Sequence, residues 1–248
     1  MNKWKGRSKG TILGYRIFVW CIKNIGIRSS YFVLYFVATY YFIFEKKSNQ
    51  YISYYFKNRL NFSALKTKLS VFRSYFVFGK VLIDKTAISV GLRNRFTYEF
   101  DGIENIKNLL AEKKGGVLIS AHIGNFEIAE HFFADIDFDA QINLVTTDQE
   151  VTAIREYMES ISVKKSNIKF IFVKDDMSHI FRINEALSNN ELICFTGDRY
   201  FEGSKFLEAD LLGKTAKFPA GPFLIASRLR VPVVYVYVMK EKNLHYHL

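Results

Sequence analysis

The feature that most constrains the fold is an alternation of short apolar segments with longer amphipathic ones, from residue 96 almost to the end of the chain. Short apolar runs bounded by turn residues are typical of buried strands, whereas helices show apolar residues at helical spacing. This spacing predicts strands at 96–100, 117–121, 142–147, 168–173, 192–197 and 231–239, with 244–248 pairing to the last. Helices are predicted at 102–116, from about 125, after 147 to about 162, at 178–190 and at 218–230. The alternation predicts an α/β fold with a central mixed, mostly parallel sheet flanked by helices.

The first hundred residues have a different composition. They hold 18 Lys and Arg against 3 Asp and Glu, whereas residues 101–248 hold 17 against 21, so the net charge of +11 belongs to the first part. Apolar stretches at 11–26 and 29–44 lie there, and amphipathic helical spacing follows at 50–95. Basic, aromatic-rich, apolar segments are typical of anionic membrane surfaces, so we predict N-terminal membrane-associating helices. A nucleic-acid partner is not predicted, because long apolar runs do not suit a wet nucleic-acid face.

The stretch Ser29–Phe44 has 16 residues without a charge. As a helix it spans roughly 24 Å, less than the roughly 30 Å of a bilayer core. We therefore predict an interfacial or shallowly inserted helix pair, with a true span or a buried hairpin in a soluble core as alternatives. The predicted domains are a membrane-associating segment, 1–60, and an α/β domain, 61–248. Because the chain stops inside an apparent strand, we expect this domain to be truncated at its C-terminal end.

The segment VLISAHIGNFE, residues 117–127, is the main candidate for a site. His122 follows a buried strand, and ligand sites of open α/β sheets form outside the carboxyl ends of strands. An imidazole suits general-base work near neutral pH, and a carboxylate such as Glu127 can orient the ring. Gly124 allows the backbone to approach a substrate closely. The alternative is a structural histidine at a strand end, with Glu127 placed by the helix dipole.

Other candidates are weaker. Asp198 and Arg199 follow the predicted strand 192–197, and Arg155 lies in the helix after 142–147. An arginine can stabilise an oxyanion or hold a phosphate. The structural alternatives are a salt bridge between Asp198 and Arg199 in a turn, and a solvent-exposed helix face for Arg155. No P-loop, dinucleotide fingerprint or GxSxG elbow occurs. The cysteines, Cys21 and Cys194, lack a CxxC spacing, so neither a disulfide framework nor a metal site is predicted.

Several blocks of the chain resemble a known family. HIGNFE, with its His-x4-acid spacing, looks like the late lipid A acyltransferases (lauroyl and myristoyl transferases). The segment YFVLYFVATYYFIF is similar to that family's membrane-anchoring start, and three later blocks agree in order and spacing: 197–206, 211–228 and 231–241. The resemblance spans nearly the whole chain. One departure is Arg199, because family members commonly have Gln after the acidic position that Asp198 matches.

The resemblance implies an enzyme that needs no metal or other cofactor. It would use acyl-ACP, or acyl-CoA, as co-substrate and sit on the cytoplasmic face of the inner membrane, with acyl carrier protein and membrane lipid as partners. His122 would be the base and Glu127 its acidic partner. Residues near the substrate would be Gly124, Asn125, Arg155, Asp198 and Arg199.

The sequence therefore predicts transfer of a fatty acyl chain to a hydroxyl of a lipid A-type glycolipid precursor. One alternative is an acyltransferase with another acceptor, such as an amino-acid lipid, a lysophospholipid or a polyene pigment. The other is a non-catalytic membrane-surface protein that kept the fold.

Overall fold

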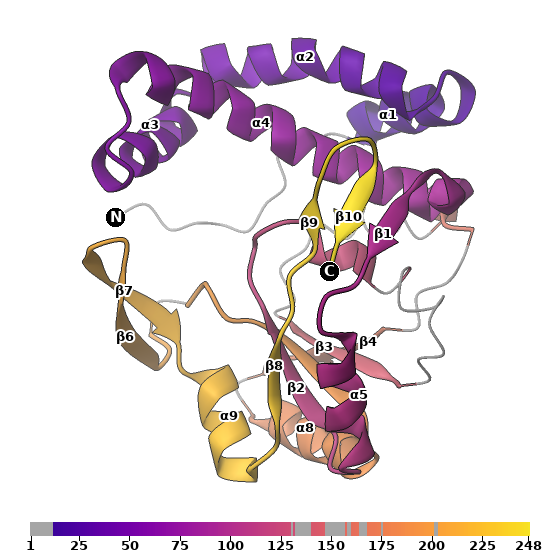
Figure 1. The fold of residues 1–248 in the computed structure, drawn as a ribbon, viewed down its shortest axis with the longest axis vertical. Helices are drawn as coiled ribbons and strands as arrows, with labels where there is room; N and C mark the ends of the chain where they lie inside the picture. The colour runs from indigo at the N-terminus through magenta and orange to yellow at the C-terminus, as the bar shows by residue number, and fades with distance from the viewer. Residues whose placement is uncertain are drawn as a thin grey trace.

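A helical layer lies across one end of an α/β body in the computed structural model (Figure 1). The structure describes residues 12–129, 131, 140–146, 157, 160–163, 168–174, 176–200 and 203–248. The predicted helix after residue 147 falls almost entirely outside these ranges, as does Arg155.

The body is built on a sheet of five strands in the order β4-β3-β5-β2-β8. Each neighbouring pair in this sheet is parallel. The strands are β2 (Gly116–Ser120), β3 (Ile142–Thr146), β4 (Lys169–Phe172), β5 (Leu192–Thr196) and β8 (Val233–Tyr235). The prediction of an α/β fold with a mostly parallel sheet is confirmed.

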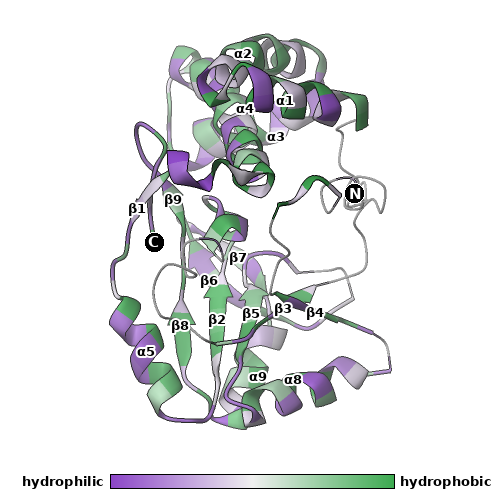
Figure 2. Ribbon diagram, turned by 90° about the vertical axis from the view of Figure 1, so that its right-hand side faces the viewer, coloured by the Kyte–Doolittle hydropathy of each residue, from purple (hydrophilic) through white to green (hydrophobic). Residues whose placement is uncertain are grey.

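The central strands β2 and β5 are largely buried on both faces, as expected of parallel strands. Along β2, Val117 and Ile119 pack with α8 (Ser178–Ser188) and α9 (Gly221–Leu229) on one face. Leu118 points to the other face, where α5 (Ile103–Ala111) and the helical layer contribute to the core. The strands β2, β5 and β8 are hydrophobic along their length (Figure 2).

A second, smaller sheet stands between the body and the helical layer. Its order is β1-β10-β9, with β10 parallel to β1 and antiparallel to β9. The strands are β1 (Thr97–Glu99), β9 (Met239–Lys240) and β10 (His245–His247). The predicted strand 231–239 is in fact divided between β8 and β9, because the chain leaves the main sheet after Val236, whose N–H donates to the Ile119 carbonyl. The predicted pairing of residues 244–248 with this segment is confirmed at Met239 and Lys240.

An exposed antiparallel hairpin of β6 (Phe206–Leu211) and β7 (Lys214–Pro219) was missed by the sequence prediction. Its two turn residues, Leu212 and Gly213, both have positive φ, 50° and 74°. Two such residues define the turn that matches the twist of a hairpin. The tip is tied to the helical layer, because Arg59 Nη2 donates to the Leu211 carbonyl at 2.8 Å.

The helical layer consists of α1 (Ile12–Asn24), α2 (Ile27–Phe44), α3 (Lys46–Tyr54) and α4 (Ala64–Ala87). A π-helical turn, η1 (Tyr55–Arg59), follows α3, and η2 (Ile88–Leu92) and the 3₁₀ turn η3 (Arg93–Arg95) follow α4. Ser63 caps α4 by accepting a hydrogen bond from the Lys66 N–H.

The helix α2 is long and apolar enough to cross a membrane, by length and composition alone. It is a candidate membrane-associating helix. Several of its large side chains are exposed: Phe32, Tyr35, Phe36, Tyr40, Ile43 and Phe44. Its other side packs on α4, and one continuous core cluster joins Leu34 of α2 to Leu118 of β2 and Tyr246 of β10. The predicted domain boundary near residue 60 stays a prediction.

The central strand β5 gives the first test of the fold. Ile193 is 0% exposed, so we expect Ile193→Ala to lower the free energy of unfolding by about 2–5 kcal/mol through lost burial and an unfilled cavity. Leu207→Ala, at a 44% exposed position in β6, should change it by about 0.5 kcal/mol or less. Denaturant unfolding measures both, and equal losses would contradict the placement of β5 at the centre.

Candidate functional site

The register of β2 and β5 determines which side chains meet at the carboxyl edge of the sheet. Ser120 pairs with Thr196, and the Gly197 N–H donates to the Ser120 carbonyl at 2.8 Å. Two residues beyond each partner of that pair stand His122 and Asp198. Because the strands are parallel and in register, these two side chains lie side by side, with 2.9 Å between His122 Nδ1 and Asp198 Oδ1.

This contact determines which ring nitrogen of His122 carries a proton. A carboxylate only accepts, so Nδ1–H donates to Asp198, and in the neutral ring Nε2 is then the acceptor. Nε2 has no hydrogen-bond partner among the described residues. The side chains of His122 and Asp198 are 36% and 29% exposed, so a substrate can reach the ring.

Glu127 contacts Lys85, whereas the sequence predicts His122 as its partner. It lies in the 3₁₀ turn η4 (Phe126–Ile128), where the predicted helix begins. Its Oε1 is 2.7 Å from Nζ of Lys85, near the end of α4. Among the hydrogen bonds of the described residues, His122 is joined to Asp198 and Glu127 to Lys85. The pairing of His122 with Glu127 stays a prediction.

Gly124 is required by close contact with another segment. It forms a parallel bridge with Val238, and its φ is +73°. A Cβ atom at this position would lie 2.0 Å from the Val238 carbonyl oxygen. The loop that carries His122 is therefore pressed against the segment between β8 and β9.

Asn125 is 2% exposed and holds the same loop from within. Its N–H donates to the Val238 carbonyl at 2.8 Å. Its side-chain Nδ2 donates to the Val81 carbonyl of α4 and to the Tyr246 hydroxyl of β10, each at 3.3 Å. The sequence analysis expected Asn125 near the substrate, and the structure shows it inside the protein, supporting the loop.

Arg199 has its Nε 4.0 Å from Asp198 Oδ2 and is 52% exposed. It therefore lies at the edge of the site, beside the carboxylate that holds His122. Arg155, also expected near the substrate, lies outside the described residues.

The described residues at this edge include neither a reactive thiol nor a cluster of metal ligands. In β5, burial raises the pKa of the Cys194 thiol to about 12, so this thiol stays protonated and unreactive near neutral pH. The described residues contain no group of three His, Cys, Asp or Glu that could hold a metal ion. His247 instead contacts Asp101, with 3.0 Å between Nε2 and Oδ2.

The sequence analysis missed Lys85 and the buried polar group beside it. Asp84 is 0% exposed and is joined by Lys240, Tyr31 and Tyr246. The one signal in the sequence was an acidic residue, Asp84, within a helical segment whose other charged residues are Lys and Arg. Its burial is known only from the structure, and charged residues are seldom buried without partners. Its partners lie far away in the sequence, so no local pattern identifies them.

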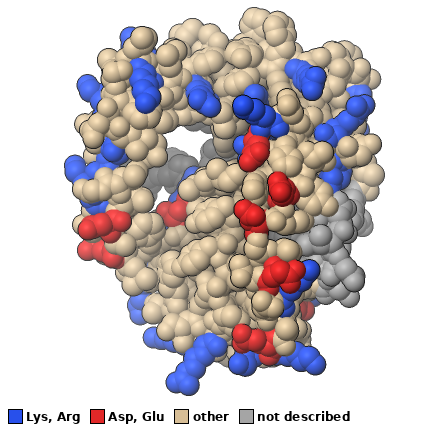
Figure 3. All heavy atoms as spheres, viewed as in Figure 1, with Lys and Arg blue, Asp and Glu red and all other residues tan. Residues whose placement is uncertain are grey.

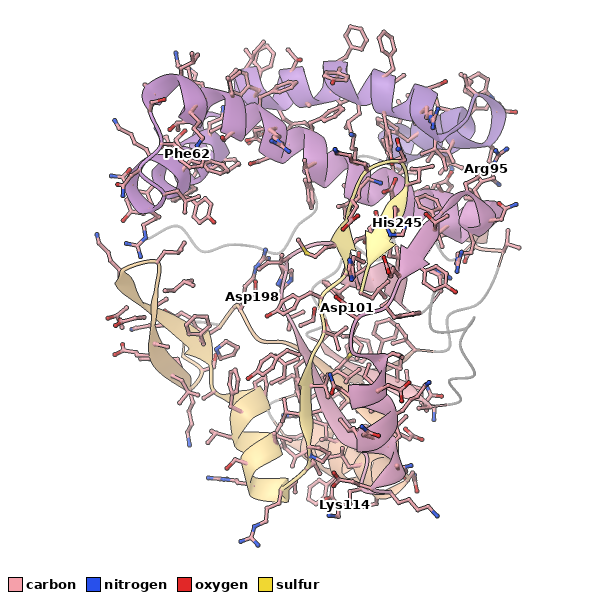
Figure 4. The ribbon with its side chains drawn as sticks, in the orientation of Figure 1. Phe62, Arg95, Asp101, Lys114, Asp198 and His245 are labelled. Atoms are coloured by element: carbon pink, nitrogen blue, oxygen red, sulfur yellow. The ribbon has the colours of Figure 1, made fainter. Side chains whose placement is uncertain are left out.

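The site opens toward a gap in the molecular surface. Figure 3 shows an opening between the helical layer and the β6–β7 hairpin. Asp198 lies at its edge on the side of the main sheet (Figure 4). Apolar side chains flank both site residues, since Ile123 is 52% exposed and Tyr200 is 38% exposed. An amphipathic substrate suits such a place.

One family model matches the chain, over residues 74–248. It describes bacterial lipid A biosynthesis acyltransferases, and the match includes His122, Glu127 and Asp198. A comparison with individual curated proteins gave no match.

Replacing Gly124 tests the close contact with Val238. We expect Gly124→Ala to destabilise the protein by about 1–3 kcal/mol, because an alanine meets both a forbidden φ and a carbonyl oxygen. The matched control is Gly221→Ala, where a Cβ meets nothing within 4 Å, and its unfolding midpoint should stay near the wild-type value. Thermal unfolding that shows Gly124→Ala to be as stable as the control contradicts the contact.

Proposed function

Because the chain belongs to the family of bacterial lipid A biosynthesis acyltransferases, we propose that it moves a fatty acyl chain from acyl-ACP, or acyl-CoA, to a hydroxyl of a lipid A-type glycolipid precursor. The chain is an acyltransferase by its family; the donor, the exact acceptor and the residue roles are the proposal. The observation that carries it is the exposed His122 ring, held at Nδ1 by Asp198 at the carboxyl edge of the sheet.

His122 is the general base. Its Nε2 takes the proton of the acceptor hydroxyl while that oxygen attacks the thioester carbonyl. The tetrahedral intermediate then collapses, the C–S bond breaks, and the imidazolium returns the proton to the leaving thiolate. Asp198 accepts the Nδ1 hydrogen bond, which maintains the tautomer and stabilises the positive ring.

The oxyanion of the intermediate needs donors nearby. The backbone amides around Gly124 and the guanidinium of Arg199 are the proposed donors. Arg199 neighbours Asp198 and is half exposed, so its guanidinium places a positive charge at the edge of the proposed site.

Glu127 is the second carboxylate of the site, proposed as the acidic partner of His122. For it to reach the ring, the ion pair with Lys85 has to open. The side chains of that pair are 36% and 38% exposed, and ion pairs at such exposure are typically worth about 0–1 kcal/mol. Opening is therefore inexpensive, and catalytic contacts often tighten only when substrate binds.

The helical layer is proposed to hold the enzyme on the cytoplasmic face of the inner membrane. Its exposed aromatic side chains and its many Lys and Arg residues support this, because such surfaces bind anionic lipid. Figure 3 shows Lys and Arg spread over this layer. The same charges suit an acidic carrier protein.

The reaction is tested by mass-spectrometric acyl transfer. Acyl-ACP or acyl-CoA is mixed in detergent with a panel of acceptors: a lipid A precursor, a lysophospholipid and an amino-acid lipid. We expect the wild type to acylate the lipid A precursor, and His122→Ala to lose about 10²–10⁴-fold in rate, because it lacks the base. Transfer to another acceptor alone rejects the proposed acceptor. Equal activity of the wild type and His122→Ala rejects the proposed base.

The roles of the two carboxylates are separated by three variants. Asp198→Asn should lower kcat by about 10²–10⁴-fold, because the partner that sets the tautomer is lost. If Glu127 acts on His122, Glu127→Gln should lower kcat by at least about 10²-fold. Lys85→Met, which breaks the same ion pair from the other side, should then keep kcat within about tenfold. Equal, small effects of Glu127→Gln and Lys85→Met would reduce Glu127 to a partner of Lys85.

A further inference from the structure

The buried carboxylate of Asp84 gathers three donors from different parts of the fold. They are Lys240 Nζ from β9, the Tyr31 hydroxyl from α2 and the Tyr246 hydroxyl from β10. Asp84 is 0% exposed and the Lys240 side chain is 12% exposed. A charge buried this deeply is tolerated only when it is paired and hydrogen-bonded. The cluster therefore constrains how the elements that supply its donors pack together.

The two tyrosine hydroxyls both bond to Asp84 and accept from different donors. Each hydroxyl donates to Asp84 and accepts from an N–H group. Tyr31 accepts from Lys240 Nζ at 3.1 Å, which keeps its contacts inside the cluster. Tyr246 accepts from Asn125 Nδ2 at 3.3 Å, which extends the cluster to the loop of His122.

The direction of the Asn125–Tyr246 bond follows from the proton count. Tyr246 has a single hydroxyl proton, and Asp84 accepts it, so the amide has to donate. The Val81 carbonyl also requires a donor, so the Asn125 NH₂ group has to face Val81 as well as Tyr246. Asn125 Oδ1 has no partner in the described part of the chain. The orientation of this buried amide therefore depends on two acceptors, Val81 and Tyr246.

We propose that Tyr246 is a positioning residue for His122, acting through the hydrogen bond from Asn125. Asn125 stands three residues after His122, and its N–H closes the loop onto Val238. With Tyr246 in place, the amide and the loop have one arrangement, and His122 stays beside Asp198. Without that acceptor the amide is held by Val81 alone. The catalytic part of this inference rests on the proposed role of His122.

The test compares Tyr246→Phe with Tyr31→Phe. Both variants remove one hydroxyl from Asp84, so both should lower the unfolding midpoint. Tyr246→Phe should lower kcat by about tenfold with KM within about twofold, because a small displacement of a base slows the chemical step rather than binding. Tyr31→Phe should keep kcat within about twofold. Equal kcat losses in the two variants overturn the proposal.

Amide hydrogen exchange gives a readout that does not need activity. By mass spectrometry, a peptide covering residues 121–126 should exchange faster in Tyr246→Phe than in Tyr31→Phe, whereas peptides from β2 should behave alike. If the wild type transfers no acyl group, the proposed function fails, and this comparison still decides whether Tyr246 holds the loop. Equal exchange at 121–126 in the two variants shows that it does not.

A third variant covers the case in which Tyr246→Phe does not fold. Asn125→Ala removes the same bond from the loop side, and should lower kcat to a similar degree while Asp84 keeps all three donors. Where both variants fold, adding Tyr246→Phe to Asn125→Ala should lower kcat little further, because both substitutions act through one hydrogen bond. An Asn125→Ala enzyme with wild-type kcat, or independent effects of the two changes, overturns the proposal.

Discussion

The burial of Asp84 is the constraint around which the helical layer and the sheets are joined. A carboxylate with no exposed surface needs donors, and none of its three side-chain partners comes from its own helix. Tyr31, Lys240 and Tyr246 are 53, 156 and 162 residues away along the chain. Removing the opposite charge from such a group leaves a buried charge uncompensated, which costs far more than breaking an exposed pair. The cluster therefore determines where α4 lies relative to α2, β9 and β10.

Once α4 is fixed, one face of it supports the site. Asp84 and Lys85 follow Val81 by three and four residues, so both lie on the side of the helix that carries Val81. Val81 accepts from Asn125, Lys85 pairs with Glu127, and Asp84 reaches Asn125 through Tyr246. The loop that carries His122 is thus held by one face of α4 and by Val238. The carboxyl edge of the main sheet and the helical layer are joined at this point.

The sequence indicates the parts of the fold that depend on local patterns. The apolar run before His122 predicted a buried strand, and the rule that sites form at carboxyl ends placed His122 and Asp198 at one edge. It did not place them side by side, because that depends on the strand order and on the pairing of Ser120 with Thr196. The sequence alone therefore offered Glu127, five residues from His122, as the nearest acid.

Other features depend on contacts that no local pattern carries. The sequence does not indicate that Gly124 lies against the Val238 carbonyl or that Asn125 is buried. The roles of these two residues near a substrate stay predictions. The hairpin β6–β7 escaped prediction because β6 is exposed throughout and no residue of β7 is buried, so the strands lack the apolar signal of a buried strand. Leu212 at positive φ also gives a weaker turn signal than Asn or Gly.

The arrangement has a consequence for an enzyme whose substrates differ in polarity. Asp198 borders the opening between the main sheet and the helical layer (Figure 4), and His122 lies beside Asp198. The helical layer carries exposed aromatic side chains. In the proposed reaction, the acyl tails of a lipid acceptor can stay with the apolar layer while its hydroxyl reaches the imidazole. Tyr31, which lies in α2 itself, donates to the same buried Asp84 carboxylate as Tyr246, which contacts the site loop. Because α2 and the loop share this buried anchor, the helix that would meet the lipid and the base that would act on it keep a fixed relation, so binding at the surface brings the hydroxyl to a base already in place.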